Sequence, residues 1–555
     1  MNFKINESVD KLRGGYYTPL PVASFLTRWA NAKNPKSILE PSCGDGVFIA
    51  SLPKHSNHKT SFTGIEVISS EAEKAKKRAQ NATNITVNIL CDDYLEWALK
   101  NINNPNKYDA VVGNPPYIRY QYLEKKSQLL AEQIFSSFNL PFTKHTNAWV
   151  PFVIASVALL SPGGRIAMVI PAEILHVLHA ASLRRFLLDE CDRILLIDPN
   201  ELLFEGVLQG TILLMAEKKK SKDNSSGKVA ITHMPNNTFL QKDPEKYFQS
   251  ATYIEGDVLN GKWMKVLLTP QELLIFETVK ESPLIKRFSE IATVDVGIVT
   301  GANDFFLVND DVVKTFSLQD YIRPMFGRSQ HCAGIIYDKK AHSQNREKGL
   351  PTNFVMLEDD NSKKYPMPVQ QYLKQGEKDK LHTRYKCRIR TPWYKVPSVY
   401  ATEIGMLKRS HNFPRLILNT AKAFTTDTAY RIQPKNEKKT EELVFCFINS
   451  LTALTAELEG RHYGGGVLEL VPSEIEKLLI PIPKKIKPDL ITLDEDIRNG
   501  KDAGKILRKQ DRKILKAIGL SSKEIKTLHD AWKHVRSRRQ RLIQEPKITS
   551  VEDND

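Results

Sequence analysis

The 555-residue chain has few cysteines and no long apolar segment. Its 6 cysteines include no Cys-x-x-Cys pair, so the sequence indicates neither a zinc knuckle nor a disulfide framework. The longest apolar stretch, residues 149–160, contains Pro151 and is too short to cross a bilayer of about 30 Å. Residues 1–15 are polar and lack the apolar core of a signal peptide. We therefore expect a cytosolic protein with no membrane partner.

The sequence also lacks an evident metal site. The pairs His55/His58 and His176/His179 have spacings that suit a metal ion, but neither pair has a clear third ligand. Histidines that share a surface or one face of a helix are far commoner than metal ligands. We expect no bound metal.

Positive charge is what the chain has in excess. Its 80 lysines and arginines outnumber its 64 aspartates and glutamates, which gives a formal net charge of +16 at pH 7. Such an excess attracts phosphates without specifying a partner. The length is ample for a buried core and predicts about three or four domains.

The most informative segment is the tetrapeptide Asn114-Pro115-Pro116-Tyr117. It follows the apolar run 108–113, which is typical of a buried parallel strand, and open α/β sheets bind ligands outside the carboxyl ends of such strands. The Asn114 side-chain oxygen and the Pro115 carbonyl can accept the two hydrogens of a flat heteroaromatic amine, and Tyr117 can stack on its ring. This pattern predicts methyl transfer to the nitrogen of a base that has left the double helix. A Pro-Pro turn closed by a core tyrosine is the structural alternative.

A strand, a glycine turn and a helix start follow one another upstream. Residues 37–46 run from a short apolar strand into a tight turn, where Gly44 and Gly46 permit a ligand to approach the backbone closely. Ile49 stands where a dinucleotide-binding loop has its third glycine. The turn therefore favours a nucleotide-type cofactor without a pyrophosphate.

Acidic residues end successive expected strands. Glu40 ends the first, and Glu66 lies in the second, about twenty residues past the turn, at the spacing of a carboxylate that binds ribose hydroxyls. After the strand 85–90, Asp92 or Asp93 can accept from the amino group of a cofactor adenine, and we prefer Asp93. Each acid alone is an ordinary strand-end residue, whereas three in register point to one site.

Five motifs, in this order, resemble the gamma-class N6-adenine DNA methyltransferases of restriction-modification systems. They are Tyr17-Thr18-Pro19, Leu39-Glu40-Pro41-Ser42-Cys43-Gly44-Asp45-Gly46, Gly64-Ile65-Glu66, Asp93-Tyr94-Leu95 and Gly113-Asn114-Pro115-Pro116-Tyr117. The resemblance implies a bacterial or archaeal enzyme, active on the nucleoid, that transfers the methyl group of S-adenosyl-L-methionine to N6 of a flipped adenine in double-stranded DNA. It also implies protection of host DNA from a cognate restriction endonuclease that acts separately.

The resemblance assigns roles to individual residues. Asn114, Pro115, Pro116 and Tyr117 are catalytic, and Phe204 is the best match for a second stacking aromatic, with core packing as its alternative. The cofactor-binding residues that it implies are Tyr17, Thr18, Pro19, Glu40, Pro41, Cys43, Gly44, Gly46, Glu66, Asp93, Tyr94 and Asn114. Family members often carry Asp-Pro-Ala-Cys-Gly-Ser-Gly in the loop, whereas this chain has glutamate, serine and aspartate at three of those places.

One expectation about local structure comes with the first motif. Thr18 can cap a helix that has Pro19 at its first position, which would leave free backbone donors near a carboxylate. A cap with no further role is the alternative.

The pattern after the tetrapeptide predicts the fold class. A helix at 149–160, a strand at 165–170, a helix at 180–188 and a strand at 193–198 continue an α/β alternation. We expect a doubly wound, mostly parallel sheet, which is the class I S-adenosylmethionine-dependent methyltransferase fold. The polar segment 217–228 is expected to be a surface loop or to lie near a boundary.

The second half of the chain has a different texture, with short apolar segments, many turns and basic residues among aromatics. Residues 384–395 could span phosphates and reach into a groove, or form a solvated strand face. We expect a catalytic domain over 1–250, a mixed α+β target-recognition domain over 251–483, and a basic helical segment over 484–555. That last segment, with Arg536, Arg538, Arg539 and Arg541, is expected to clamp DNA or to be a soluble tail.

Competing functions remain as alternatives. The same tetrapeptide occurs in methyltransferases that act on RNA bases or on protein glutamine, although those enzymes usually are short and carry an accessory domain first. A catalytically inactive DNA-specificity module would show damage in the glycine loop or tetrapeptide, and neither is damaged. No cysteine directly follows a proline, which excludes cytosine carbon-5 chemistry. We expect a monomer or a homodimer.

Overall fold

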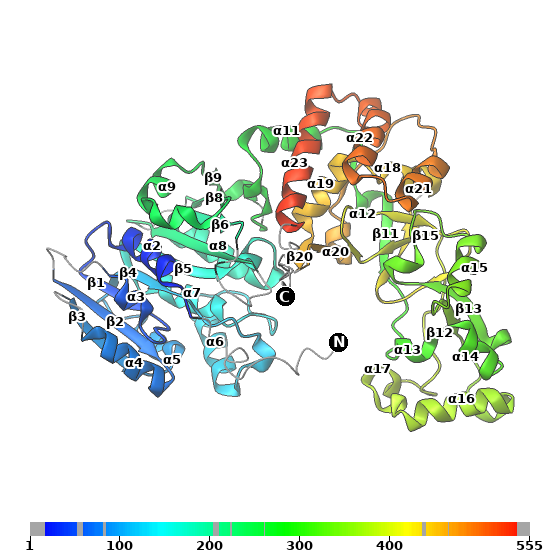
Figure 1. The fold of residues 1–555 in the computed structure, drawn as a ribbon, viewed down its shortest axis with the longest axis horizontal. Coiled ribbons are helices and arrows are strands. Elements are labelled where there is room, and N and C mark those ends of the chain that lie inside the picture. The colour runs from blue at the N-terminus through cyan, green and yellow to red at the C-terminus, as the bar shows by residue number, and fades with distance from the viewer. Residues whose placement is uncertain are drawn as a thin grey trace, which may run out of the picture. The chain divides into compact units, whose positions relative to one another are not determined.

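The computed structural model describes residues 17–52, 59–80, 85–201, 203, 210–221, 225–259, 261–435, 440–463 and 465–540. The chain divides into two compact units, residues 1–267 and 268–555, which are described separately (Figure 1). His55 and His58 of the sequence analysis lie outside the described residues. No helix among the described residues is both long and apolar enough to span a membrane.

The first unit is built on a nine-stranded sheet. Its strands are β1 (Ser37–Glu40), β2 (Thr60–Glu66), β3 (Ile85–Cys91), β4 (Tyr108–Gly113), β5 (Leu160–Pro171), β6 (Cys191–Pro199), β7 (Thr211–Lys218), β8 (Lys228–Met234) and β9 (Ile254–Glu255). They lie in the order β3-β2-β1-β4-β5-β7-β6-β8-β9. The strands from β3 to β5 pair in parallel, and β7 is antiparallel to both of its neighbours. This confirms the predicted doubly wound, mostly parallel sheet.

Helices cover the sheet. They are α2 (Leu20–Asn31), α3 (Val47–Ala50), α4 (Ser69–Ala79), α5 (Tyr94–Asn101), α6 (Lys125–Ser137), α7 (Trp149–Ala158), α8 (Ala181–Glu190), α9 (Pro244–Ser250) and α10 (Gly256–Leu259). Ala110 and Val112 of β4 belong to a core cluster that α2 also enters, while Val111 between them is equally buried. Because successive strand side chains point to opposite faces, both faces of the sheet are covered.

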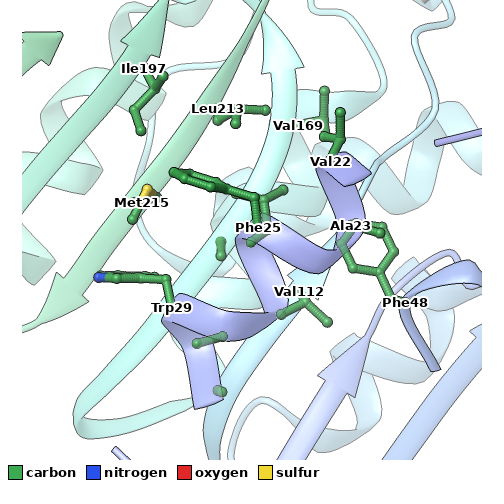
Figure 2. Close-up of a cluster of buried hydrophobic side chains, with 14 of the residues drawn as sticks. Val22, Ala23, Phe25, Trp29, Phe48, Val112, Val169, Ile197, Leu213 and Met215 are labelled. Atoms are coloured by element: carbon green, nitrogen blue, oxygen red, sulfur yellow. The ribbon is translucent and has the colours of Figure 1, made fainter. Parts of the chain in front are cut away.

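The core on one face depends on the apolar side of α2. Val22, Phe25 and Trp29 are spaced by three and four residues, which places them on one side of a helix. Figure 2 shows these side chains beside those of the sheet, with Phe25 near Leu213 and Trp29 near Met215. This packing fixes α2, and hence the segment that leads into it, against the sheet.

The predicted helices and strands of this half are present. The segment 217–228 was expected to be a surface loop or to lie near a boundary, and its residues 219–221 and 225–227 lie in no helix or strand. Its first two residues differ from this expectation, because Glu217 and Lys218 complete β7 and Glu217 is 7% exposed. The polar sequence is explained by ion pairs rather than by solvent. Arg165 on the neighbouring strand β5 is 2% exposed and faces Glu217.

Glu217 is the centre of a buried charge network. Arg165 donates from Nε and Nη2 to Glu217 Oε1 at 3.0 and 2.9 Å, and from Nη1 to Glu245 at 2.8 Å. Arg193 donates to Glu217 Oε2 at 2.9 Å, and Lys33 lies 2.6 Å from Oε1. Burial opposes ionisation of this carboxyl, but the three cations around it outweigh burial and lower the pKa of Glu217 to about 2.

We predict that Glu217→Gln destabilises the first unit by about 3–5 kcal/mol at neutral pH, because it leaves a buried arginine short of a counter-charge. The pKa of Glu217 in the folded protein lies below the usual glutamate value of 4.5, so the stabilisation is present above about pH 4.5 and is lost as the pH falls toward 2. Urea denaturation of wild type and variant at several pH values measures the difference. Glu255→Gln, which removes one exposed partner of Lys228, is the matched control and should change little. Equal stability of the Glu217→Gln variant and wild type at pH 7 would contradict the assignment.

The second unit contains several small sheets. Its strands are β10 (Ile285–Arg287), β11 (Ala292–Val296), β12 (Leu307–Val308), β13 (Ile322–Phe326), β14 (Asn353–Val355), β15 (Ile404–Leu407), β16 (Arg409–Ser410), β17 (Leu416–Leu418), β18 (Phe424–Thr425), β19 (Ala429–Pro434), β20 (Arg461–Tyr463), β21 (Val467–Glu469) and β22 (Leu479–Pro481). They form sheets of order β11-β19-β15-β17, β12-β14-β13-β18, β16-β21-β20 and β10-β22. Short strands of this kind match the predicted mixed α+β texture.

Helices surround these sheets. They are α11 (Pro270–Lys280), α12 (Phe288–Ile291), α13 (Asn303–Phe306), α14 (Asp310–Thr315), α15 (Lys339–Glu347), α16 (Met367–Lys378), α17 (Tyr385–Arg388), α18 (Thr440–Cys446), α19 (Ser450–Glu459), α20 (Pro472–Ile475), α21 (Leu490–Arg498), α22 (Ala503–Ile514) and α23 (Ser522–Gln540). The division into catalytic, target-recognition and C-terminal parts stays a prediction.

Two arginines of α23 that were offered for DNA contact are used inside the unit. Arg539 is 3% exposed and donates to Glu457 from Nε at 2.9 Å and from Nη2 at 2.6 Å. Arg536 donates to Asn412 and lies 5.1 Å from the ring centre of Trp532. A fully buried carboxylate such as Glu457 needs a cation, which explains why Arg539 is held inside. Arg541 lies outside the described residues.

Candidate active site

The candidate site lies where the strand order of the sheet reverses. β1 pairs in parallel with both β2 and β4, and the chain leaves β1 at Glu40 and β4 at Gly113. In doubly wound sheets this switch point opens a crevice at the carboxyl ends of the strands. The Ser42 hydroxyl donates to the Asn114 carbonyl at 3.0 Å and so links the two loops. The glycine turn and the tetrapeptide, which are 72 residues apart at this contact, therefore meet at one place.

The side chain of Asn114 is held from two directions. Its Nδ2 donates to the Thr18 hydroxyl at 3.2 Å, and its Oδ1 accepts from the Tyr117 hydroxyl at 2.7 Å. The Tyr117 hydroxyl also lies 3.0 Å from the Val169 carbonyl of β5. These contacts hold the carboxamide between the segment that leads into α2, the tetrapeptide and β5.

The backbone of the tetrapeptide is rigid and offers an acceptor. Pro115 is buried and Pro116 is half-buried, and proline fixes φ while it keeps its carbonyl. No donor in the described part of the chain lies within hydrogen-bond distance of the Pro115 carbonyl oxygen. The role of this carbonyl as an acceptor for a ligand stays a prediction.

Thr18 differs from its expected role as a helix cap. α2 begins at Leu20, Pro19 occupies the N-cap position, and no side chain caps the helix. The Pro19 carbonyl accepts from the amides of Val22 and Ala23 at 3.0 and 3.1 Å, so the first turn is satisfied by backbone alone. The Thr18 hydroxyl is 7% exposed and accepts from Asn114 instead. Tyr17 precedes it and is 60% exposed.

The glycine turn is closed by Glu66 at the end of β2. Glu66 Oε2 accepts from the Gly44 amide and Oε1 from the Ile68 amide, both at 2.9 Å. Burial raises the pKa of Glu66, and the amide donors oppose this rise. Gly46 has φ of +87°, and a Cβ there would lie 3.1 Å from Ala75 Cα, so this position requires glycine. Cys43 beside it is buried, and burial raises the pKa of its thiol.

Glu40, at the end of β1 beside the glycine turn, is a buried acid without an ion-pair partner among the described residues. It is 1% exposed, and its Oε2 is buried without a hydrogen-bond partner among the described residues. Burial, followed by the carboxylates of Glu66 and Asp45, raises the pKa of Glu40 well above its usual range. An uncompensated carboxyl in a crevice is a natural acceptor for a cationic ligand.

The third acidic position begins α5. Asp93 Oδ1 accepts from the amides of Leu95 and Glu96 at 2.9 and 3.2 Å, so Asp93 is the N-cap of this helix. Asp92 Oδ1 accepts from the Asp93 amide at 2.8 Å. Both acids follow β3, and the preference for Asp93 as a cofactor ligand stays a prediction. Tyr94 is 3% exposed and its hydroxyl lies 2.9 Å from Ser156 Oγ, so its side chain packs between α5 and α7.

Two family models match consecutive parts of the chain. Residues 4–253 match the model of the family described as N-6 DNA Methylase. Residues 260–515 match the model of the C-terminal domain of type II methyltransferase M.Eco57I. The chain belongs to the DNA methyltransferases of restriction-modification systems.

Known proteins resemble this methyltransferase along most of its length. Type II methyltransferase M.AccI of Acinetobacter calcoaceticus is 25% identical over 90% of this chain and 92% of its own. Type II methyltransferase M.XamI of Xanthomonas campestris pv. amaranthicola is 22% identical over 84% and 85%. The structure of the type IIL restriction-modification enzyme MmeI in complex with DNA matches with a TM-score of 0.54 and 12% identity, over 94% of this chain and 77% of that one. This last likeness supports the fold.

One buried polar residue near the tetrapeptide was not predicted from sequence. Asn147 is 8% exposed, its Oδ1 is buried without a partner in the described residues, and it forms an antiparallel bridge with Arg119 just after the tetrapeptide. The Ala148 amide donates to the Ile118 carbonyl at 2.8 Å. No sequence signal pointed to Asn147, because its place depends on a contact across 28 residues. Phe204, the expected second stacking aromatic, lies outside the described residues.

We predict that Glu40→Gln stabilises the ligand-free methyltransferase. The pKa of Glu40 in the folded protein lies above the usual glutamate value of 4.5, so its burial lowers stability as the pH rises above about 4.5 and not below. An increase of 1 kcal/mol in the free energy of unfolding raises the melting temperature of a unit of this size by about 2–4 °C. We expect the melting temperature of Glu40→Gln at pH 8 to exceed that of wild type by at least this amount. Differential scanning fluorimetry at pH 5 and pH 8 measures the difference.

The control for this variant is Glu73→Gln on α4, where the carboxylate is exposed and pairs with Lys76. It should leave the melting temperature unchanged at both pH values. A lower melting temperature for Glu40→Gln at pH 8 would show that the acid has a stabilising partner and contradict the assignment.

Proposed function

We propose that this methyltransferase transfers the methyl group of S-adenosyl-L-methionine to the N6 amino group of an adenine flipped out of double-stranded DNA. In this role it protects host DNA from a cognate restriction endonuclease that acts as a separate protein. The observation that carries the proposal is the pair of acceptors at the switch point, the Asn114 side-chain oxygen and the Pro115 carbonyl, with the Tyr117 ring beside them.

The pair of acceptors answers a chemical need of adenine. The lone pair of its exocyclic nitrogen is delocalised into the ring, so the nitrogen attacks only when its hydrogens are held and it becomes more tetrahedral. A carboxamide oxygen has two lone pairs, so the bond from Tyr117 does not prevent Asn114 Oδ1 from accepting one amine hydrogen. The Pro115 carbonyl accepts the other. In our proposal the Thr18 and Tyr117 contacts hold the carboxamide in the orientation that this needs.

The reaction we propose is an in-line displacement. When bound, S-adenosyl-L-methionine would supply an electrophilic methyl group attached to a positively charged sulfur. As the amine nitrogen forms its bond to the methyl carbon, the carbon–sulfur bond would break and the sulfur would leave as a neutral thioether. During attack both hydrogens stay on the amine nitrogen, where they donate to Asn114 Oδ1 and to the Pro115 carbonyl. One of them then leaves as a proton to solvent, because methylation has made the nitrogen positively charged and acidic. No side chain of the tetrapeptide is required as a nucleophile or a strong base.

The glycine turn and its acids suit the proposed cofactor. Glu40 has an unpartnered buried oxygen that would accept from the methionine ammonium. Glu66 would bind the ribose hydroxyls while its amide contacts shape the turn around Gly44. Asp93 would accept from the adenine amino group of the cofactor, and Gly46 gives the backbone its close approach.

We predict that Asn114→Ala lowers methyl transfer by more than about 100-fold, since loss of one charge-stabilising contact in an active site costs rates of this order. Transfer of labelled methyl groups to duplex DNA measures the rate, and single-molecule sequencing of DNA from expressing cells locates the methylated base. Tyr117→Phe is the paired variant, because it keeps the stacking ring and removes only the hydroxyl that holds Asn114. We expect it to lose less activity than Asn114→Ala.

Several results would contradict the proposed function. Normal turnover by Asn114→Ala, with unchanged cofactor and DNA binding, would remove the tetrapeptide from catalysis. Methylation of RNA or of a protein glutamine by the wild-type enzyme, with duplex DNA left unmodified, would refute the substrate. Methylation of a base other than adenine would refute the acceptor.

We predict that Glu66→Ala weakens binding of S-adenosyl-L-methionine by about 5-fold to 150-fold, the range expected when polar partners are left unsatisfied by about 1–3 kcal/mol. Isothermal titration calorimetry measures the dissociation constant. Glu73→Ala on the exposed side of α4 removes the same charge outside the crevice and should bind the cofactor normally. Unchanged affinity in Glu66→Ala would remove Glu66 from the cofactor site.

A further inference from the structure

The basic and aromatic run 384–395 contains residues of two kinds in the structure. One kind points into the second unit and fixes the segment. Arg390 donates from Nη1 to the Thr300 carbonyl at 2.8 Å and from Nη2 to the Val299 carbonyl at 2.6 Å. Tyr394 is 3% exposed, and its hydroxyl donates to the Asp359 carbonyl at 2.9 Å. The residues that end the run therefore serve as anchors rather than as contacts for a ligand.

The start of the run is fixed from below as well. The Cys387 thiol is buried and lies 3.7 Å from the Thr300 carbonyl. A Cβ on Gly301, whose φ is +81°, would lie 2.7 Å from Lys386 Cβ, so the backbone of 299–301 and the helical turn α17 are in close contact. α17 and α16 lie at the same end of the second unit (Figure 1). The turn is thus held firmly where it meets solvent.

The residues of the other kind lie on or directly beside α17 and are exposed to solvent. Tyr385 is 65% exposed and Ile389 is 60% exposed, and because they are four residues apart they lie on one side of the turn. Arg384, Lys386 and Arg388 beside them are exposed too. In the described part of the chain none of these three cations takes part in an ion pair. Residues 384–395 also contain no acidic side chain.

We propose that α17 is a wedge that enters the DNA helix, in which Tyr385 and Ile389 insert between base pairs while Arg384, Lys386 and Arg388 bind the flanking phosphates. This deepens the proposed function and rests on it. We call the five residues the α17 wedge.

Charge complementarity identifies DNA as the occupant of this surface. Two large apolar side chains on a rigid turn are costly to leave in water, and three cations without a carboxylate partner exclude a purely apolar partner. Lys386 Nζ lies 5.6 Å from the centre of the Tyr385 ring, so it stays beside the side chain that we propose to insert. A duplex offers both complements at once, since its phosphates pair with the cations and its base steps receive apolar side chains. Wedges of this kind partly unstack a step and kink the duplex. Insertion would bend the duplex, whereas phosphate contacts alone would not. The bend angle therefore distinguishes insertion from simple phosphate binding.

The first experiment tests insertion with the full chain. The probe is a duplex of about 30 base pairs that carries the sequence methylated by the wild-type enzyme in cells, with a fluorescent donor and acceptor at its ends. Wild type should bend this duplex and raise the transfer efficiency. The double variant Tyr385→Ala, Ile389→Ala should lose the bend and raise the dissociation constant by about 10-fold to 100-fold, as expected for the loss of two aromatic or apolar contacts with bases.

The controls separate failure of this inference from failure of the proposed function. The double variant should keep the melting temperature and the cofactor affinity of wild type, since both side chains are exposed. If wild type binds duplex DNA and methylates it, and the double variant binds and bends it equally, the α17 wedge is refuted and the proposed function stands. If wild type itself neither binds nor methylates the duplex, the proposed function is refuted. If only one of Tyr385→Ala and Ile389→Ala loses the bend, insertion is supported for that side chain and refuted for the other.

The second experiment tests the cations by their salt dependence. Arg384→Gln, Lys386→Gln and Arg388→Gln together should reduce the slope of log affinity against log salt concentration by roughly 2 to 3, about 0.9 for each phosphate contact. The matched control is Lys339→Gln, Lys340→Gln and Lys348→Gln, which removes the same charge from exposed positions on and after α15. The control should leave the slope unchanged. Equal slopes for the two triple variants would show that only total charge matters and would overturn the phosphate contacts.

Discussion

The adjacency of β1 and β4 is the constraint on which the site depends. Parallel pairing of Ile38 with Ala110 and of Leu39 with Val111 puts the ends of two strands side by side, although one belongs to the glycine turn and the other to the tetrapeptide. A strand order without this reversal would leave the acids of the turn and the acceptors of Asn114 and Pro115 on separate loops. The Ser42 contact with the Asn114 backbone then fixes the distance between them. In the proposed reaction, the substrate amine and the cofactor would meet here because the strand order reverses between β1 and β4.

The sequence predicted the parts of this arrangement that depend on local pattern. β4 ends at Gly113 as expected, because an apolar run that stops at a glycine and an asparagine is readable without any distant partner. The acids at the ends of β1, β2 and β3 were found in the same way. The expectation that Thr18 caps its helix was wrong, because its hydroxyl accepts a hydrogen bond from Asn114, 96 residues away, and not from the helix that follows it. The start of the polar segment 217–228 was misplaced, because the cations that bury Glu217 come from parts of the chain that are distant in sequence, such as Arg165 and Lys33.

The arginines show why a basic composition does not locate a nucleic-acid surface. Arg165, Arg390 and Arg539 each donate to several partners within the chain, and in each case the guanidinium joins segments that are far apart in sequence. Their charges count toward the formal total of +16, but these guanidinium groups bind other parts of the chain and are not available to DNA phosphates. The cations that remain available are found only when each side chain is placed, and around α17 they surround two exposed apolar side chains.

Buried Glu40 differs from the other buried glutamates because it lowers the stability of the ligand-free protein. A buried carboxyl beside other acids is unfavourable in the ligand-free protein, whereas buried Glu217 and Glu457 both have cations and stabilise the fold. The difference lies in where each acid sits, since Glu40 alone of these three ends a strand at the switch point. A chain that left this carboxyl unpaired for no purpose would be less stable than one with glutamine there. The arrangement is explained if a cationic ligand completes the pair, because the repulsion present before binding is then removed on binding and adds to the affinity of the site.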